Sequence, residues 1–413
     1  MQRFCYHGVC VMILAGACVE RSDVLIPGPI TDAVAEPRAA PFVDQISANN
    51  GHTCARSGDV LYCWGDNALG QLGVGSVEDR LTPTRLEQVG WQSVQTGLTH
   101  TCALSQQGEV YCWGNNERGQ LGQGDTTLSR LPVRVELDRG AVALSSGFNH
   151  TCALLENGEL WCWGDNNEGQ LGQSDRSPGP ESRVADALFP VLIPAPALTA
   201  GSPGQWKVVD AGEGHTCALQ VDESLWCWGR NSQGQVGTPT REGQQRSPVL
   251  VSSDQEWARV DAGLNYTCAL DREGFSWCWG HNQGTNSGSG NPFGMEAVDV
   301  YVPTRVGTGP WVDISTHTFH TCGLDAAAEL WCWGRTAEGQ IPGPGQDVRV
   351  SPLRVASNVA IVSAGMFSTC FAALDGSLQC SGNNDRWQLG AAGREEGIFL
   401  PVTLPLPAGG AGL

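Results

Sequence analysis

A short pattern of alternating apolar and polar positions recurs along the chain. Its second copy runs Gly-Leu-Thr-His-Thr-Cys-Ala-Leu over residues 97–104 and Val-Tyr-Cys-Trp-Gly over residues 110–114. A Val/Ile-rich stretch precedes the first Gly, and a later stretch carries a Pro-x-x-Val pattern, as at residues 132–135. Short alternating runs that are separated by Gly- and Asn-containing turns are typical of β-strands. Each copy therefore predicts four short strands.

The pattern repeats seven times, with the first cysteine of each copy at positions 54, 102, 152, 217, 268, 322 and 370. A chain of 413 residues would by default be divided into two or three domains. Repeats of about fifty residues that are each built from four strands are instead typical of propeller blades, which close into one domain. The sequence predicts an all-β, seven-bladed β-propeller over residues 43–404.

The spacing of the cysteines fixes the register of the central hairpin in each blade. With residues 106–108 as a three-residue loop, Cys102 lies opposite Cys112 and Leu104 lies opposite Val110. In the first repeat the spacing is one residue shorter, and a two-residue turn at residues 58–59 restores the same pairing. Directly opposed positions are close enough for a disulfide.

Fourteen of the seventeen cysteines form such regular pairs, which predicts a disulfide framework. Reduced core thiols and zinc ligation are the alternatives, although zinc needs closer Cys spacing or matching His ligands. The expected pairs are Cys54–Cys63, Cys102–Cys112, Cys152–Cys162, Cys217–Cys227, Cys268–Cys278, Cys322–Cys332 and Cys370–Cys380.

The recurring His-Thr-Cys-Ala-Leu, Cys-Trp-Gly and Gly-Gln-Leu-Gly motifs resemble the regulator of chromosome condensation repeat family over residues 42–404. The resemblance implies a seven-bladed propeller and two precedents for function. The family's namesake catalyses guanine-nucleotide exchange on a small GTPase, and a secreted bacterial member inhibits β-lactamase. Local departures from the motifs are Tyr266 and Ser368 in place of the repeat His, and Ser381 in place of the repeat Trp; the fifth unit lacks Gly-Gln-Leu-Gly.

The start of the chain is typical of an export signal. Residues 1–17 carry Arg3, then an apolar run, then small residues, and the run is too short for a permanent membrane anchor. Residues 14–18, Leu-Ala-Gly-Ala-Cys, resemble a bacterial lipoprotein box, which would lipidate Cys18. Ordinary signal-peptide cleavage is the alternative. Residues 18–42 are rich in Pro and Ala and predict a tether, and residues 405–413 predict a flexible tail.

The charge balance disfavours nucleic acid as a partner. The chain carries 24 Lys and Arg against 43 Asp and Glu, a net charge of −19, whereas a nucleic-acid binder neutralises phosphates with basic side chains. Anionic membranes are disfavoured for the same reason. The single lysine, Lys207, follows Trp206, so the Gly-Lys pair of a phosphate-binding loop does not occur.

No motif for catalysis emerges, and neither a cofactor nor a bound metal is expected. The repeat histidines could be read as metal ligands, but equivalent positions in different blades would form a wide ring, so we expect a structural role. The repeat tryptophans could form a sugar-binding set, and packing within the blades is the favoured interpretation. These residues are His52, His100, His150, His215 and His320, and Trp64, Trp113, Trp163, Trp228, Trp279 and Trp333.

Two insertions are the candidates for partner binding. The spacing of first cysteines stretches to 65 residues between the third and fourth copies, against 48 to 51 in most others. The extra segment, about residues 174–205, holds an apolar run that we expect in an inter-strand loop, either as a packed flap or as a contact patch. A second excursion covers residues 284–302. The candidate residues are Leu188, Phe189, Leu192, Ile193, Phe293 and Met295.

Together these features predict a monomeric, non-enzymatic protein-binding scaffold outside the bacterial cytoplasm, either anchored to the envelope through Cys18 or secreted. Nucleotide exchange on a small GTPase is the alternative, and an enzyme of the envelope is a weaker one. Strand order at the two ends leaves the closure of the propeller ring open.

Overall fold

The computed structural model describes residues 42–173, 185–197, 204–240, 243–252, 254–282, 299–307, 309–343, 348–391 and 398–405. The chain divides into two units, residues 1–40 and 41–413, and every described residue belongs to the second. The described residues form β-strands and connecting turns, with no helix among them. Accordingly, this part of the protein contains no helix capable of spanning a membrane.

Within the described ranges, 28 strands form seven four-stranded sheets. The innermost strands are β1 (Gln45–Ala48), β5 (Trp91–Thr96), β9 (Ala141–Ser146), β13 (Trp206–Ala211), β17 (Trp257–Ala262), β21 (Asp313–Thr316) and β25 (Val359–Ala364). The second strands are β2 (His52–Ser57), β6 (His100–Ser105), β10 (His150–Leu155), β14 (His215–Gln220), β18 (Tyr266–Asp271), β22 (His320–Leu324) and β26 (Ser368–Ala373).

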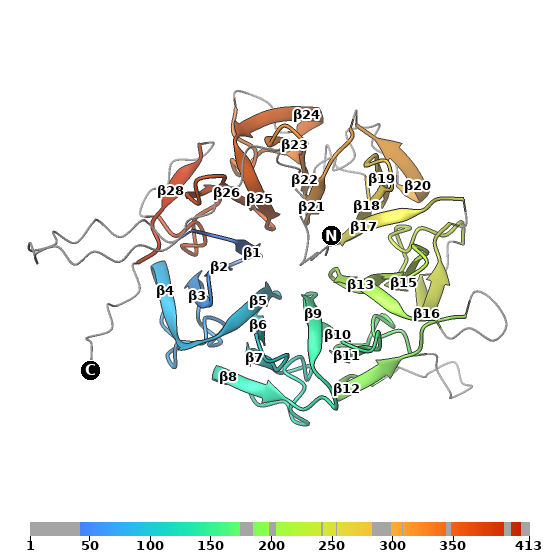
Figure 1. Ribbon diagram of the computed structural model, residues 1–413, viewed down its shortest axis with the longest axis horizontal. Coiled ribbons are helices and arrows are strands. Elements are labelled where there is room, and N and C mark those ends of the chain that lie inside the picture. Colours follow the sequence, from blue (N-terminus) through green and yellow to red (C-terminus); the bar gives the residue numbers. More distant parts are fainter. Residues whose placement is uncertain are drawn as a thin grey trace, which may run out of the picture. The chain divides into compact units, whose positions relative to one another are not determined.

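The third strands are β3 (Val60–Gly65), β7 (Val110–Gly114), β11 (Leu160–Gly164), β15 (Leu225–Arg230), β19 (Ser276–Gly280), β23 (Glu329–Arg335) and β27 (Leu378–Gly382). The outermost strands are β4 (Arg80–Val89), β8 (Ser129–Val135), β12 (Ala187–Ile193), β16 (Gln244–Leu250), β20 (Val300–Val306), β24 (Val348–Ser357) and β28 (Leu400–Val402). The sheets stand around a common centre as blades (Figure 1), which confirms the predicted seven-bladed propeller.

The hairpin register agrees with the prediction in all seven blades. Cys102 pairs with Cys112 and Leu104 pairs with Val110. In the first blade Ser57 pairs with Val60, so residues 58–59 form the expected two-residue turn. The structure joins the seven predicted cysteine pairs as disulfides, each with its Cα atoms 4.1 Å apart. All fourteen cysteines are fully buried.

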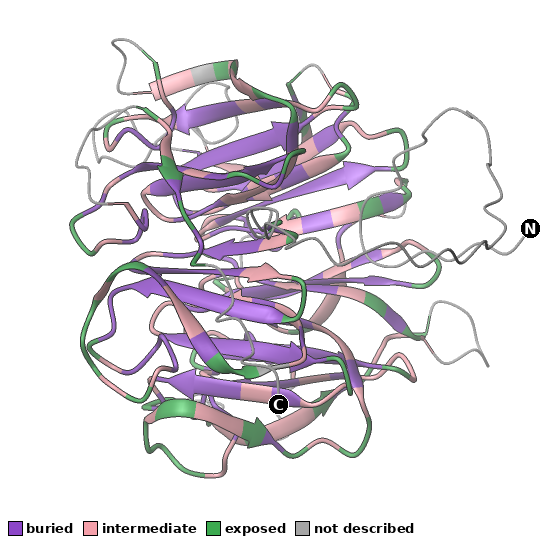
Figure 2. Ribbon diagram, turned by 60° about the vertical axis from the view of Figure 1, so that its left-hand side comes forward, coloured by how far each residue is buried: buried purple, intermediate pink, exposed green. Residues whose placement is uncertain are grey.

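The hydrophobic core lies between the blades rather than at one centre. In the described part of the chain, seven apolar clusters each join two neighbouring blades. Six repeat tryptophans lie in these clusters with 0–1% of their surface exposed. Figure 2 shows buried residues along the strands and exposed residues mainly in the connecting segments. The tryptophans thus pack neighbouring blades together, which agrees with the packing interpretation.

The ring closes by packing, without exchange of a strand. Every blade consists of four consecutive strands, including the first (β1–β4) and the last (β25–β28). The seam between them is a standard apolar cluster that contains Ile46, Trp64 and Leu378. The Tyr62 hydroxyl donates to the carbonyl of Pro405, the first residue of the predicted C-terminal tail, at 3.0 Å.

The apolar run at residues 188–193 is not a loop, so this expectation was wrong. It belongs to β12, the outermost strand of the third blade. Ile193 is buried in the seam with the fourth blade, whereas Phe189 is 63% exposed. The insertion moves the fourth strand of this blade further along the chain. The strand therefore does not lie at the position that the spacing of the other copies predicts. Pro190 fits an outermost strand because an edge has unpaired N–H positions.

Candidate functional site

A hydrogen-bond relay crosses the seams between blades. At the seam between the third and fourth blades, His150 Nε2 lies 2.9 Å from the Thr216 hydroxyl. That hydroxyl donates to the Gln170 carbonyl at 2.8 Å. The Trp228 indole donates to the same carbonyl at 2.8 Å. The histidine–threonine contact recurs at His52–Thr101 (2.9 Å), His100–Thr151 (3.0 Å), His215–Thr267 (2.8 Å) and His320–Thr369 (2.7 Å).

The relay determines the protonation state of these histidines. A threonine hydroxyl has one proton, which goes to the glutamine carbonyl, so its oxygen accepts from the histidine Nε2–H. Each Nδ1 is then the unprotonated nitrogen, and it has no partner in the described structure. Burial lowers the pKa of His52 to about 4 and the pKa of each of the other four to about 3. They are neutral structural groups that join neighbouring blades.

Where a residue of the repeat motif is replaced, the hydrogen bonds across one seam differ from those across the others. The Tyr266 hydroxyl lies 3.1 Å from the Thr321 hydroxyl, so tyrosine spans the seam where histidine is missing. The Ser381 hydroxyl donates to the Gly339 carbonyl at 2.6 Å in place of an indole. The Ser368 hydroxyl is buried and has no partner in the described structure. The closing seam therefore lacks the histidine-type bond.

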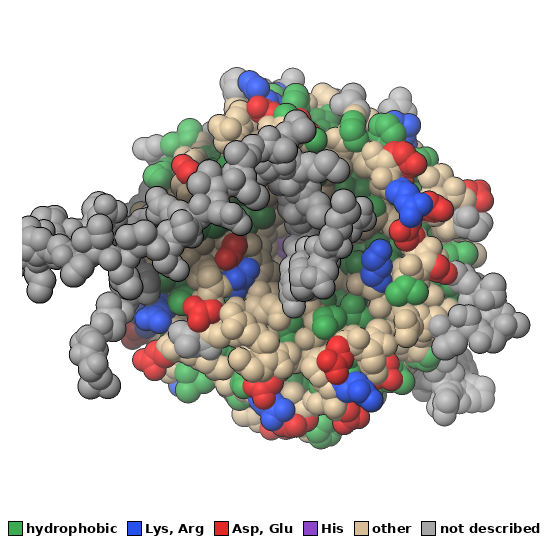
Figure 3. Space-filling view, in the orientation of Figure 1, with side chains coloured by type: hydrophobic (Ala, Val, Ile, Leu, Met, Phe, Trp, Pro, Cys, Tyr) green, Lys and Arg blue, Asp and Glu red, His purple; other side chains and the backbone are tan. Residues whose placement is uncertain are grey.

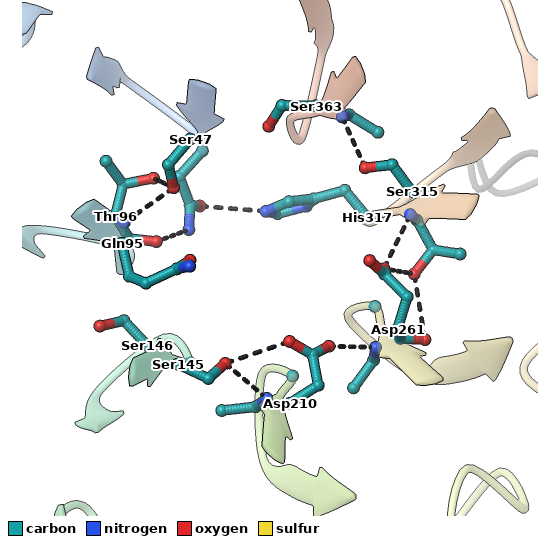
Figure 4. Close-up of a pocket in the computed structure, with 18 of the residues that line it drawn as sticks. Ser47, Gln95, Thr96, Ser145, Ser146, Asp210, Asp261, Ser315, His317 and Ser363 are labelled. Carbon is teal, nitrogen blue, oxygen red and sulfur yellow. Dashed lines mark hydrogen bonds between the residues drawn. The ribbon is translucent and has the colours of Figure 1, made fainter. Parts of the chain in front are cut away.

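The innermost strands line a central tunnel with a cavity of about 110 Å³. One polar side chain per blade occupies the same tunnel-facing position: Ser47, Gln95, Ser145, Asp210, Asp261, Ser315 and Ser363 (Figure 4). Six of them accept a backbone N–H from the next blade, donated by Thr96 (2.9 Å), Ala211 (2.9 Å), Ala262 (2.5 Å), Thr316 (2.8 Å), Ala364 (2.9 Å) and Ala48 (3.0 Å). These bonds run around the tunnel and include the closing seam.

Two carboxyl groups from adjacent blades share this tunnel. Asp210 accepts from the Ser145 hydroxyl at 3.1 Å, and Asp261 accepts from the backbone and hydroxyl of Thr316. Burial raises the pKa of Asp210 to about 6. Burial, followed by repulsion from Asp210, raises the pKa of Asp261 well above its usual value. The sequence carries a signal for this pair in the repeated Val-Asp-Ala-Gly at residues 209–212 and 260–263, although neither copy matches a catalytic or metal-binding motif.

A polar contact crosses one end of the tunnel. His317 Nε2 lies 3.2 Å from the Asn49 side-chain oxygen, and these residues come from the sixth and first blades (Figure 4). Burial lowers the pKa of His317 to about 4. Because the histidine is therefore neutral, it adds no positive charge to the lining.

The loops that follow the innermost strands carry apolar side chains, of which Phe148 lines the cavity. Leu98, Phe148, Leu264, Phe319 and Phe367 occur in five of these loops, and all are half-buried. Backbone bonds link neighbouring loops, for example from the Leu98 N–H to the Phe148 carbonyl at 3.1 Å. The Phe319 and Phe367 rings stack with centroids 5.2 Å apart. Figure 3 shows hydrophobic and charged side chains around the central hollow of the face in view.

The structure does not gather the predicted partner-binding residues into one site. Leu188, Phe189, Leu192 and Ile193 lie on β12 at the rim, while Phe293, Met295 and Cys18 lie outside the described residues. Phe189 precedes a proline, as do Leu131 and Val302 in the outermost strands β8 and β20. Those two residues are also exposed, at 57% and 43%. The exposure of Phe189 is thus a feature of the repeat rather than of the insertion.

No group of three or more His, Cys, Asp or Glu in the described ranges is placed to hold a metal ion. The fold and its seam relay define a repeat-built propeller. Models described as the regulator of chromosome condensation (RCC1) repeat match residues 59–104, 107–154, 157–219 and 222–270, and also residues 91–120, 141–170 and 206–235. Together these matches span about half of the chain. The chain belongs to the RCC1 repeat family.

Two curated relatives illustrate the range of the family. The ultraviolet-B receptor UVR8 of Arabidopsis thaliana is 29% identical over 251 residues, which are 59% of this chain and 54% of the receptor. The probable E3 ubiquitin-protein ligase HERC6 of Homo sapiens is 32% identical over 192 residues, which are 44% of this chain and 19% of the ligase. The chain thus spans about half the length of the first relative and a fifth of the second.

Solved structures share the fold. Human WBSCR16 superposes with a TM-score of 0.71 at 20% identity, over 85% of this chain and 95% of that protein. Yeast RCC1 (Prp20), in a crystal structure with Kap60 bound, superposes with a TM-score of 0.64 at 21% identity, over 78% of each chain. At these identities the likeness is one of fold.

Proposed function

We propose that this protein is a non-enzymatic scaffold that binds a protein partner outside the cytoplasm. The observation that carries the proposal is a disulfide in every blade, each between directly opposed strand positions. Disulfides persist in oxidising compartments and are rare in the cytosol, where thiols are kept reduced. Seven equivalent bridges suit a protein that folds after export.

The start of the chain supports the same compartment. Residues 1–17 have the order of an export signal, and the stretch ending at Cys18 resembles a lipoprotein box. Lipidation at Cys18 would anchor the propeller to a membrane through the tether at residues 18–42. Residues 1–41 lie outside the described ranges, so this part of the proposal rests on the sequence alone.

Binding rather than catalysis suits the polar groups that the structure describes. The repeat histidines and threonines are hydrogen-bonded to each other, but both are fully buried and the threonine proton is committed to a carbonyl. A group in that setting cannot reach a substrate. Propellers of this family also have a protein-binding precedent, since Kap60 is bound to yeast RCC1 in its crystal structure.

Peptide-mapped mass spectrometry without reduction, on protein from its native host, tests the proposal. Seven within-blade disulfides and a mature chain beginning at a diacylated Cys18 are expected. Fourteen free thiols and an intact Met1 would contradict export, and nucleotide exchange would become the function to test. Cross-linking in the intact host should then join a protein partner to the propeller, and the absence of any cross-linked protein would contradict the scaffold.

A further inference from the structure

The ring of tunnel bonds is interrupted at one seam, between the second and third blades. Six tunnel-facing side chains accept a backbone N–H from the next blade, but no such bond reaches Gln95 from Ser146 (Figure 4). The Gln95 amide makes no hydrogen bond to another described residue. Two hydrogen-bonding groups, the Gln95 amide and the Ser146 hydroxyl, are consequently open at this seam.

The Ser146 hydroxyl is the more informative of the two. Ser146 is 9% exposed and lines the cavity, and its hydroxyl has no partner in the described structure. In equivalent positions, the Thr96 hydroxyl lies 2.9 Å from that of Ser47, and the Thr316 hydroxyl donates to Asp261. An unpaired buried hydroxyl costs free energy unless something binds it. The seam between the second and third blades therefore offers an unpaired hydroxyl to a bound group.

The same cavity has more acidic than basic side chains in its lining. Asp210 and Asp261 line it, and its described lining contains neither Lys nor Arg. Arg230 is paired with both Glu213 at 2.8 Å and Glu168 at 2.9 Å, and Arg259 is paired with Asp313 at 2.9 Å, so both arginines are already engaged by other carboxylates. An entering cation would neutralise the two tunnel carboxyl groups.

We propose that this end of the tunnel binds the ammonium or guanidinium group of a lysine or arginine side chain that a protein partner inserts. Asp210 and Asp261 supply the charge, and Gln95 and Ser146 supply neutral acceptors. A guanidinium has five N–H donors and an ammonium three, so either could satisfy several of these acceptors at once. The proposal rests on the protein-binding function above and specifies its contact site.

The surroundings favour a protein side chain over a free amine. Phe148 lines the polar cavity, and the neighbouring loops carry the half-buried apolar residues Leu98, Leu264, Phe319 and Phe367. An apolar surround that excludes water from a central charged contact is typical of protein interfaces. The net charge of −19 would also steer a basic partner towards the propeller.

Short peptides test the site directly. Acetyl-Phe-Arg-Phe-amide and acetyl-Phe-Lys-Phe-amide carry a basic side chain between two apolar ones, and acetyl-Phe-Gln-Phe-amide is the uncharged control. In isothermal titration calorimetry we expect saturable binding of the basic peptides that is at least tenfold tighter than binding of the glutamine peptide. Equal binding of all three peptides, or none by any, would overturn the proposal.

Variants then locate the site. Asp210→Asn combined with Asp261→Asn should weaken binding of the arginine peptide at least tenfold, whereas Asp138→Asn, on the exposed surface, should leave it unchanged. The double variant should also resist denaturant at pH 7.5 at least as well as wild type, because it removes buried carboxylates that burial disfavours. A purely structural role for these groups predicts lost stability and unchanged binding.

Proton release provides a readout in the unmodified protein. A cation beside Asp210 and Asp261 lowers the pKa of both, so binding at pH 6, close to the pKa of Asp210, should release protons. The measured heat should therefore differ between phosphate and bis-Tris buffers, which have different ionisation enthalpies. If the double variant fails to fold, Ser146→Ala with the same peptides replaces it, and a heat independent of buffer would contradict the proposal.

The two proposals can fail separately. If a partner is cross-linked to wild type and to the Asp210→Asn, Asp261→Asn variant equally, the tunnel site is wrong and the scaffold function stands. If no partner is cross-linked to wild type, the scaffold function itself fails.

Discussion

Replacing Thr216 with valine removes one hydroxyl from the seam between the third and fourth blades. The hydroxyl accepts from His150 Nε2 at 2.9 Å and donates to the Gln170 carbonyl at 2.8 Å. Both His150 and Thr216 are fully buried, so water cannot replace it. The carbonyl keeps its bond from Trp228, at 2.8 Å, but the histidine N–H loses its partner.

The expected loss follows from these two bonds. An unpaired buried donor costs about 1–3 kcal/mol, and a lost bond to a carbonyl that keeps another partner costs about 1 kcal/mol. We therefore expect Thr216→Val to lower the free energy of unfolding by about 2–4 kcal/mol. Guanidinium chloride titration under non-reducing conditions measures it, with the fluorescence of the buried tryptophans as the signal.

Two further variants make the result decisive. Thr84→Val removes a hydroxyl that donates only to the exposed Thr82 carbonyl at 3.2 Å, so it should change stability by less than about 0.5 kcal/mol. Thr216→Ser keeps the hydroxyl and loses one methyl group, which costs about 1 kcal/mol. If Thr216→Val were no more destabilising than Thr84→Val, the relay would not hold the blades together.

Four other outcomes are expected. Acidification should destabilise the fold, because the five repeat histidines have pKa values of about 3–4 in the folded protein and near 6.5 in the unfolded chain. Their full contribution to the free energy of unfolding is present above pH 6.5, and denaturant titration at pH 5.5 should show a loss of about 1.4 kcal/mol per histidine. The two tunnel carboxyl groups partly offset this loss, because their raised pKa values favour the folded protein at lower pH. Replacing both cysteines of one blade with alanine should cost about 3 kcal/mol, measured by thermal unfolding. Gly73→Ala should lower the melting temperature more than Gly58→Ala. Both glycines have positive φ, but a methyl group at Gly73 would lie 2.6 Å from the Trp113 indole nitrogen, whereas one at Gly58 would meet open space. Equal melting temperatures would contradict this prediction. The purified propeller should leave the rate of nucleotide release from small GTPases unchanged, and acceleration would support the exchange alternative.

The sequence predicts the blades well because the strands that pair within a blade are close together in the sequence. Alternation places Cys102 opposite Cys112 within one hairpin, and the same register recurs in every copy. The fourth strand of the third blade was missed because the insertion before Ala187 separates it from its expected position. The pattern there, with Ile193 inward and Phe189 outward, is that of the other outermost strands, and a comparison between copies would have found it.

The tunnel site was harder to predict because it is formed by the ring. Asp210 and Asp261 are 51 positions apart in the sequence, and each by itself is one polar residue at the end of a short strand. They meet only because consecutive blades place equivalent positions around one axis. Likewise, the unpaired Ser146 hydroxyl depends on the geometry of the neighbouring Gln95, which alternation along a strand does not determine.

Because the ring closes without sharing a strand between the first and last blades, each sequence repeat corresponds to one complete blade. Joining the two ends and opening the chain between any two blades would leave all seven sheets intact, and each such circular permutant would keep the same covalent bridges. The seams are not equal, however, since Ser368 gives the closing seam no counterpart of the histidine contact. The natural ends of the propeller therefore lie at a seam that the histidine contact does not reinforce.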